Sequence, residues 1–238
     1  MGSPISGFRV GILTLNTTHS LKPGNVQNAT TFPFPVVYAV VRDVSIPSLL
    51  SGQASALGPI LAAIAELEDR GVSVIVGACG SFVHFQEAAT RAARVPVFLS
   101  IMLEVPLLLR ALPAQSKLGI IFASAATFSP RVCDQSGISD TSRIIALGAD
   151  EIEAFRPILS QSGVLDSLAL ERGIVELVQR TIARNPSIAA WLLQCSDLPP
   201  YAAAIRSATN RPVFDMALLI EHLHGSAARR IYTGEQQG

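Results

Sequence analysis

The chain has 238 residues, of which 49% are hydrophobic and 15% charged, and 18 basic and 18 acidic side chains leave no formal net charge. This composition indicates a folded protein with a substantial core and excludes an intrinsically disordered chain. The sequence contains no run of Lys or Arg that could bind the phosphates of a nucleic acid backbone, so nucleic acid is not expected as a partner.

The cysteines and the apolar runs indicate the compartment. Three cysteines cannot all pair within one chain, and no Cys-x-x-Cys occurs, so we expect free thiols and a cytoplasmic location. The apolar stretch 10–15 is too short for the core of a secretion signal. No run approaches the about 20 apolar residues that span a bilayer, so no membrane association is expected.

Short apolar runs alternate with longer amphipathic runs along almost the whole chain. The predicted strands are 8–15, 36–41, 72–78, 97–99, 118–123, 143–147, 188–194 and 213–214. The predicted helices are 48–70, 82–93, 103–112, 128–136, 149–161, 167–185, 199–209 and 217–224. This alternation is typical of an α/β protein built on parallel sheets.

The chain contains an internal repeat. Gly119 lies 108 residues after Gly11 in a similar strand, and Cys195 lies 116 residues after Cys79. Two halves of the same topology explain both spacings. We predict an N-terminal half of residues 1–113 plus 211–238 and a C-terminal half of residues 114–210.

Cys79 and Cys195 each end a predicted buried strand that a predicted helix follows. Ligands of open α/β sheets bind at the carboxyl ends of the strands, so the two thiols are expected to face one cleft. A helix N-terminus would lower the pKa of each thiol, and its free N–H groups would hold a carboxylate. One thiolate would then remove a proton α to that carboxylate, while the other thiol returns one to the opposite face.

A structural role for the cysteines stays open, because cysteine is often an inert part of a core. Cys133 is expected to be incidental. No cofactor is expected, because neither Lys22 nor Lys117 stands in a setting typical of a Schiff base and no glycine-rich phosphate loop follows a strand. No metal is expected, because the histidines lack partners at ligand spacing.

The motifs around the two thiols resemble those of the aspartate/glutamate racemase superfamily. Cys79-Gly80-Ser81 stands in the place of its Cys-Asn-Thr motif, and Cys195-Ser196-Asp197 in that of its second cysteine motif. Residues 118–127 resemble the strand and turn that open the second half, and residues 211–215 a return strand. The superfamily includes amino-acid racemases, hydantoin racemases, arylmalonate decarboxylases and maleate isomerases.

The resemblance implies two pseudo-symmetric flavodoxin-like halves, a site in the cleft between them, chemistry without a cofactor and a homo-oligomer, a dimer. The expected function is that of an isomerase, a racemase or epimerase in which Cys79 and Cys195 transfer protons at the carbon α to a carboxylate or acyl group of a small substrate. Three alternatives stay open: a maleate-isomerase-like enzyme with a covalent cysteine, a decarboxylase-like enzyme with a single base, and a two-lobed binding protein without catalysis.

The expected substrate-binding residues lie next to the two thiols and at the ends of the first strands of both halves. They are Asn16, Gly80, Ser81, Phe82, Ser124, Thr127, Ser196 and Asp197. Two departures from the superfamily pattern stand out: residues 14–18 carry no carboxylate for a substrate ammonium, and Gly80 replaces an Asn. Aspartate and glutamate are therefore not expected as substrates.

Overall fold

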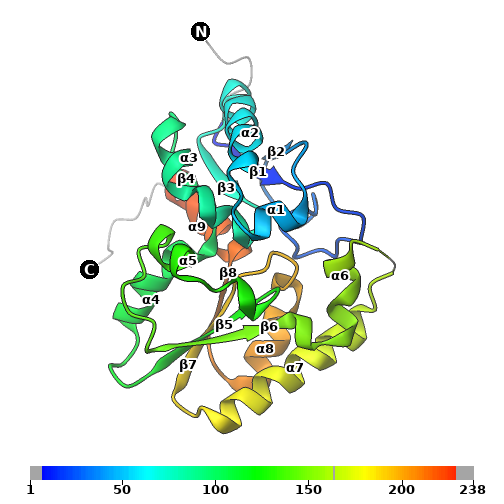
Figure 1. Ribbon diagram of the computed structural model, residues 1–238, viewed down its shortest axis with the longest axis vertical. Coiled ribbons are helices and arrows are strands. Elements are labelled where there is room, and N and C mark those ends of the chain that lie inside the picture. The colour runs from blue at the N-terminus through cyan, green and yellow to red at the C-terminus, as the bar shows by residue number, and fades with distance from the viewer. Residues whose placement is uncertain (1–6, 163, 229–238) are drawn as a thin grey trace, which may run out of the picture.

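A computed structural model describes residues 7–162 and 164–228, and in them the chain forms two four-stranded parallel sheets flanked by helices (Figure 1). The strands are β1 (Val10–Thr14), β2 (Val36–Val40), β3 (Val74–Gly77), β4 (Val97–Phe98), β5 (Lys117–Phe122), β6 (Ile144–Gly148), β7 (Ile188–Leu193) and β8 (Val213–Asp215). The helices are α1 (Ile46–Leu50), α2 (Leu57–Asp69), α3 (Gln86–Ala92), α4 (Val105–Ala111), α5 (Pro130–Gln135), α6 (Arg156–Ser160), α7 (Ser167–Arg184), α8 (Ala202–Thr209) and α9 (Met216–Ala227).

The two sheets repeat one topology. The first has the order β2-β1-β3-β4 and the second β6-β5-β7-β8, so each strand of the first sheet has a counterpart in the second. All the predicted strands are present, with ends moved by no more than two residues. The predicted α/β class with two similar halves is confirmed.

The predicted helix 48–70 is wrong as a continuous element. Helix α1 ends at Leu50, and Gly52 has a positive φ of 63°. A Cβ on this glycine would lie 2.7 Å from Cγ of His84, so the break also lets another segment approach closely. The predicted helix 149–161 is wrong too over its first turns, which are two short 3-10 helices ahead of α6.

Alternating side chains on the strands divide the core into three parts. One face of each sheet contributes to a cluster common to both halves, with Val10 and Ile12 from β1 and Leu118 and Ile120 from β5. The other face of the first sheet packs with α2 and α3, and the other face of the second sheet with α7 and α8. Because successive strand residues point to opposite faces, one short apolar strand contributes side chains to two of these clusters.

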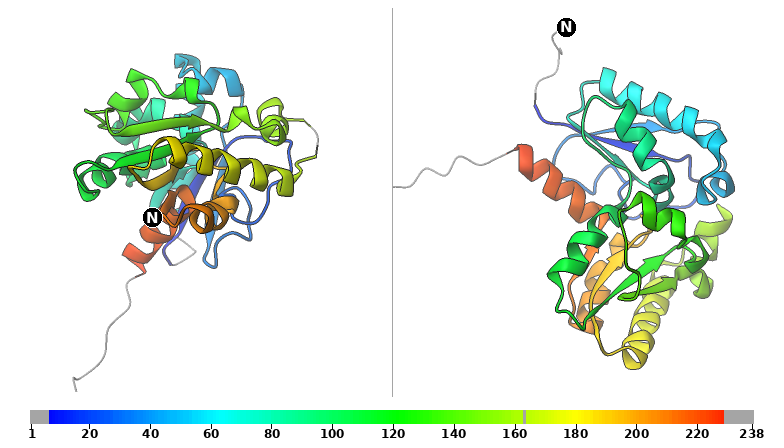
Figure 2. Two further views of the ribbon diagram at one scale, coloured as in Figure 1. Left: turned by 90° about the horizontal axis from the view of Figure 1, so that it is seen from below. Right: turned by 60° about the vertical axis from the view of Figure 1, so that its left-hand side comes forward.

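The C-terminal segment departs from the predicted division. Residues 213–215 form β8, which pairs with β7, so this strand belongs to the second sheet and not to the N-terminal half. Helix α9 then crosses back, and the His224 ring stacks on Phe34 with 3.8 Å between ring centroids. The right-hand view of Figure 2 shows α9 where the two halves meet.

Among the described residues, no helix combines the length and hydropathy that crossing a bilayer requires.

Candidate active site

Cys79 and Cys195 line one small cavity between the two halves, with a volume of about 80 Å³. Each thiol follows the end of an equivalent strand, β3 or β7, as the internal repeat predicts. The lining residues are Leu15, Thr17, His19, Gln27, Ile46, Leu50, Ala78, Cys79, Gly80, Ser81, Ala123, Ile158, Leu159, Gln161, Gln194, Cys195, Ser196 and Asp197.

Cys79 is held in an extended conformation between strand and helix. The N–H of Ala78 donates to the Leu13 carbonyl at 2.8 Å, and Cys79 caps the 3-10 helix Gly80–Phe85. Burial raises the pKa of the Cys79 thiol to about 11, although backbone N–H groups of Ser81 and Phe82 act in the opposite direction. Hydrogen bonding from these N–H groups favours the thiolate but does not outweigh burial.

The surroundings of Cys195 disfavour the thiolate more strongly than those of Cys79. Its thiol donates to Oδ2 of Asp197 over 3.8 Å. Burial and then the Asp197 charge raise the pKa of Cys195 well above its ordinary value. The predicted lowering of both thiol pKa values is therefore wrong, because loss of hydration outweighs the effect of the helix-end N–H groups.

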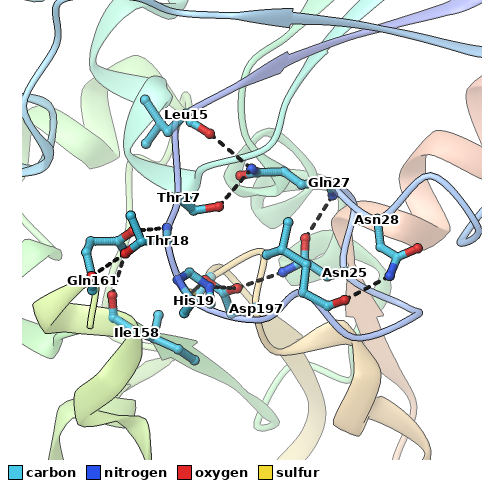
Figure 3. Close-up of polar contacts among 12 residues, drawn as sticks. Leu15, Thr17, Thr18, His19, Asn25, Gln27, Asn28, Ile158, Gln161 and Asp197 are labelled. Carbon is cyan, nitrogen blue, oxygen red and sulfur yellow. Dashed lines mark hydrogen bonds and ion pairs between the residues drawn. The ribbon is translucent and has the colours of Figure 1, made fainter. Parts of the chain in front are cut away.

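Asp197 joins the two halves through a buried hydrogen-bonded cluster (Figure 3). Its Oδ1 accepts from His19 Nε2 at 2.9 Å and from Asn25 Nδ2 at 2.7 Å. The hydrogen bond to Asp197 raises the pKa of His19. Sequence reasoning missed the role of His19, because its partner lies 178 residues away in the chain and no local spacing reveals it.

Gln194 occupies the space that a side chain at position 80 would need. A Cβ on Gly80 would lie 2.2 Å from Nε2 and 2.4 Å from the backbone oxygen of Gln194. Both residues line the cavity. An amide from the other half therefore lies beside Gly80, and sequence reasoning missed this residue.

The remaining predicted binding residues divide into two groups. Ser81, Ser196, Gly80 and Asp197 line the cavity, as stated above. The other four, Asn16, Phe82, Ser124 and Thr127, lie outside its lining. Asn16 faces a neighbouring open groove, Phe82 is fully buried in the core of the first half, and Thr127 donates its hydroxyl to the carbonyl of Ser124 at 2.7 Å.

No group of three or more His, Cys, Asp or Glu side chains that could hold a metal ion occurs in residues 7–162 and 164–228. The described lining of the cavity offers two thiols, one carboxylate, one imidazole, hydroxyls and amides.

Comparison with known proteins identifies the family. A dimethylsulfoniopropionate lyase from Durusdinium sp. clade D is 31% identical over 216 residues, which cover 87% of this chain and 70% of the relative. The chain belongs to the dimethylsulfoniopropionate lyase family. Dimethylsulfoniopropionate lyase 5 of Emiliania huxleyi (strain CCMP1516) is 27% identical over 228 residues, covering 92% of this chain and 45% of the relative. The chain thus spans about half to two thirds of the length of these family members.

Solved structures of similar fold identify the fold of this chain. Aspartate racemase of Picrophilus torridus matches with a TM-score of 0.60 and 18% identity, over 95% of this chain and 96% of that one. Unliganded arylmalonate decarboxylase matches with a TM-score of 0.55 and 15% identity, over 97% of both chains. The fold is that of the aspartate/glutamate racemase superfamily, as the cysteine motifs predict. No family model matches the chain.

Proposed function

We propose that this protein is a lyase that eliminates a leaving group from the β-carbon of a small carboxylate, with a β-sulfonio acid of the dimethylsulfoniopropionate type as substrate. The observation that carries the proposal is the pair of thiols from equivalent strand ends that line one cavity. The names of the family members supply the substrate class.

The reaction needs one base. A thiolate removes a proton from the carbon α to the carboxylate, and the electrons of that C–H bond form a double bond to the β-carbon. The bond from the β-carbon to sulfur breaks with its electron pair on sulfur, so the products are dimethyl sulfide and acrylate. Because the leaving group departs as a neutral thioether, it needs no proton from an acid. The thiol formed then loses its proton to restore the base.

A cationic substrate suits the two thiols. Burial keeps the pKa values of both thiols above their ordinary range, with the Cys79 thiol at about 11. A positive charge brought beside a thiol favours its thiolate form and lowers its pKa. Binding of a sulfonium group would therefore generate the base only when substrate is present, whereas a substrate with an excess of negative charge would oppose it.

Racemisation or epimerisation at the same carbon is the second candidate, and two thiols on one cavity favour it. It shares the first step, removal of the α-proton, but requires a second thiol to return a proton to the opposite face. The two reactions therefore differ in how much they need the second cysteine.

The first test measures both outcomes with one set of variants. Purified protein is given dimethylsulfoniopropionate, and dimethyl sulfide in the headspace and acrylate in solution are quantified. We expect at least one of Cys79→Ser and Cys195→Ser to lose about 100-fold or more of the release rate, because a positioned base contributes on the order of 10²–10⁴. The larger loss identifies the base.

Cys133→Ser is the matched control, because Cys133 lies in the common core away from the cavity lining. It should release dimethyl sulfide at the rate of the unaltered protein. A Cys79→Ser/Cys195→Ser double variant that still releases dimethyl sulfide at that rate would disprove the proposal. Loss of α-deuterium exchange in both single variants with a chiral acid, without any elimination, would instead favour the racemase.

A further inference from the structure

Within the described part of the chain, Asp197 is the one carboxylate that lines the cavity, and no Glu, Lys or Arg lines it. A zwitterionic substrate needs a partner for its cationic group in so small a space, since an unpaired buried charge is costly. Asp197 follows Cys195 by two residues, and its Oδ2 lies 3.8 Å from the Cys195 sulfur. The surroundings of this carboxylate therefore decide whether it can pair with a cationic group beside the thiol.

The two oxygens of this carboxylate have different surroundings. Oδ1 is occupied by two strong donors, His19 Nε2 at 2.9 Å and Asn25 Nδ2 at 2.7 Å. Among the described residues, Oδ2 accepts only from the weak thiol donor of Cys195, at 3.8 Å. The side chain of Asp197 is 16% exposed, whereas that of His19 is 1% exposed. The cluster in Figure 3 thus fixes one oxygen and leaves the other for a ligand.

We infer that Oδ2 of Asp197 is the subsite for an onium group of the substrate, a sulfonium or quaternary ammonium, and that protonation of His19 switches this subsite off. The inference rests on the proposed function, because it names the partner of the substrate's positive charge. With neutral His19 the pair carries one negative charge, which attracts an onium group. With protonated His19 the pair has no net charge, and the attraction is largely lost.

The geometry connects this subsite to the chemistry. Because Cys195 Sγ lies 3.8 Å from Oδ2, an onium group held there brings its neighbouring carbon atoms close to that thiol. The residues described as lining the cavity include no Phe, Tyr or Trp, so among them the carboxylate is the group suited to hold a cation in place of an aromatic ring.

Other titratable groups around the pair do not mask the effect of His19 between pH 6 and pH 8. Cys79, Cys195 and Tyr201 interact with Asp197, and all three have raised pKa values, so they carry no charge in this range until a cation binds. The His19→Gln variant separates any response of the thiols from that of His19. The Lys22 ammonium lies over the Tyr201 ring, 5.4 Å from its centroid. Hydrogen bonding to Asp197 raises the pKa of His19 above its ordinary value of 6.5.

The experiment compares two ligands that differ in one charge. They are 3-(trimethylammonio)propionate and its carbon isostere 4,4-dimethylpentanoate, and a quaternary ammonium is a much poorer leaving group than a sulfonium. Their dissociation constants are measured by calorimetry at pH 8 and pH 6. We expect the cation to bind at least tenfold more tightly than the isostere at pH 8, and this preference to shrink several-fold at pH 6.

Three variants separate the parts of the inference. Asp197→Asn should abolish the preference for the cation, while His19→Gln should keep a preference and remove its pH dependence. Asp69→Asn, which removes an exposed carboxylate on α2, is the control and should change neither. Equal affinity for the two ligands at pH 8 overturns the inference, and so does an unchanged preference in Asp197→Asn.

If Asp197→Asn does not fold, the pH series of the unaltered protein still decides, because a preference that is the same at pH 6 and pH 8 overturns the switch. Failure of the proposed function gives a different result. A protein that prefers the cation but releases no dimethyl sulfide would refute the lyase and leave the onium subsite standing.

Discussion

Gly80 shows how a single residue determines the shape of the cavity. The absence of a side chain allows the backbone and the amide of Gln194, from the other half, to approach within the space of a Cβ. Two segments that follow the strands β3 and β7 are thereby brought into contact beside the thiols. The glycine is therefore required by a close approach, whatever its backbone angles.

Gly80→Ala should consequently destabilise the protein and reduce activity together. Overpacking of this kind costs about 1–3 kcal/mol, because the collision with the Gln194 carbonyl cannot be relieved by rotating a side chain. Urea unfolding gives the free energy of unfolding, and release of dimethyl sulfide gives the activity. In the double variant Gly80→Ala/Gln194→Ala only the side-chain part of the collision is removed, so recovery should be partial. Unchanged stability in Gly80→Ala would contradict this packing.

The thiols were predictable from the sequence, whereas their charged neighbours were not. Cys79 and Cys195 each end a short apolar run, and that local pattern places them at the carboxyl end of a strand. His19 lies in a polar loop, and its side chain is buried where that loop contacts Asp197 of the other half. A pair separated by 178 residues leaves no periodic signal, so only the fold reveals it.

At the scale of elements, the contact between β5 and β7 depends on another missing side chain. Gly119 on β5 is paired with Trp191 on β7, and a Cβ at position 119 would lie 2.3 Å from the indole ring. Trp191 is fully buried, so the ring has no free direction in which to move. A large side chain and a glycine on adjacent strands thus fill one space between them.

Gly119→Ala should lower the free energy of unfolding by about 1–3 kcal/mol, measured by urea denaturation. Gly225→Ala is the matched control with the opposite sign. Gly225 lies within α9 with open space around its Cα, so alanine should stabilise the helix by roughly 0.5–1 kcal/mol. Equal effects of the two changes would show that helix propensity and strand packing are not separated as described here.

The strands were predicted well and the helices less well, for a physical reason. A buried strand such as β3 is a short apolar run between breakers, and its length is set by that run. The pattern of apolar residues in 48–70 continues through Gly52, because hydrophobic periodicity does not report backbone angles. Likewise, 3-10 and α-helices present similar apolar faces, so the turns ahead of α6 were not distinguished from it.

At the scale of the whole molecule, polar contacts from several elements fasten one half to the other around the cavity. Arg131 of α5 donates to the Gly52 carbonyl at 2.9 Å, and Lys22 donates to Ser167 at 2.9 Å. The pair of His19 and Asp197 is the most buried of these contacts. Its protonation state therefore affects how firmly the halves are joined, as well as the charge of the cavity.

The pH dependence of stability follows from the raised pKa of His19. A histidine whose pKa is higher in the folded than in the unfolded protein contributes stability that is fully present below about 6.5 and is lost as pH rises through the raised value. The free energy of unfolding should accordingly fall as pH rises from 6.5 toward 8.5. His19→Gln should lack this decrease, with urea unfolding at pH 6, 7 and 8.5 as the measurement. A decrease of the same size in the variant would assign it to other groups.

The core common to both halves has a consequence for how the protein is made. Val10 and Ile12 near the beginning of the chain are covered by Leu118 and Ile120 and finally by Leu219 and Ile220 of α9. While the ribosome is still translating the second half, one face of the first sheet has nothing to cover it. Completion of this common core therefore waits until α9 has emerged, and until then the nascent chain exposes an apolar surface of the kind that chaperones bind.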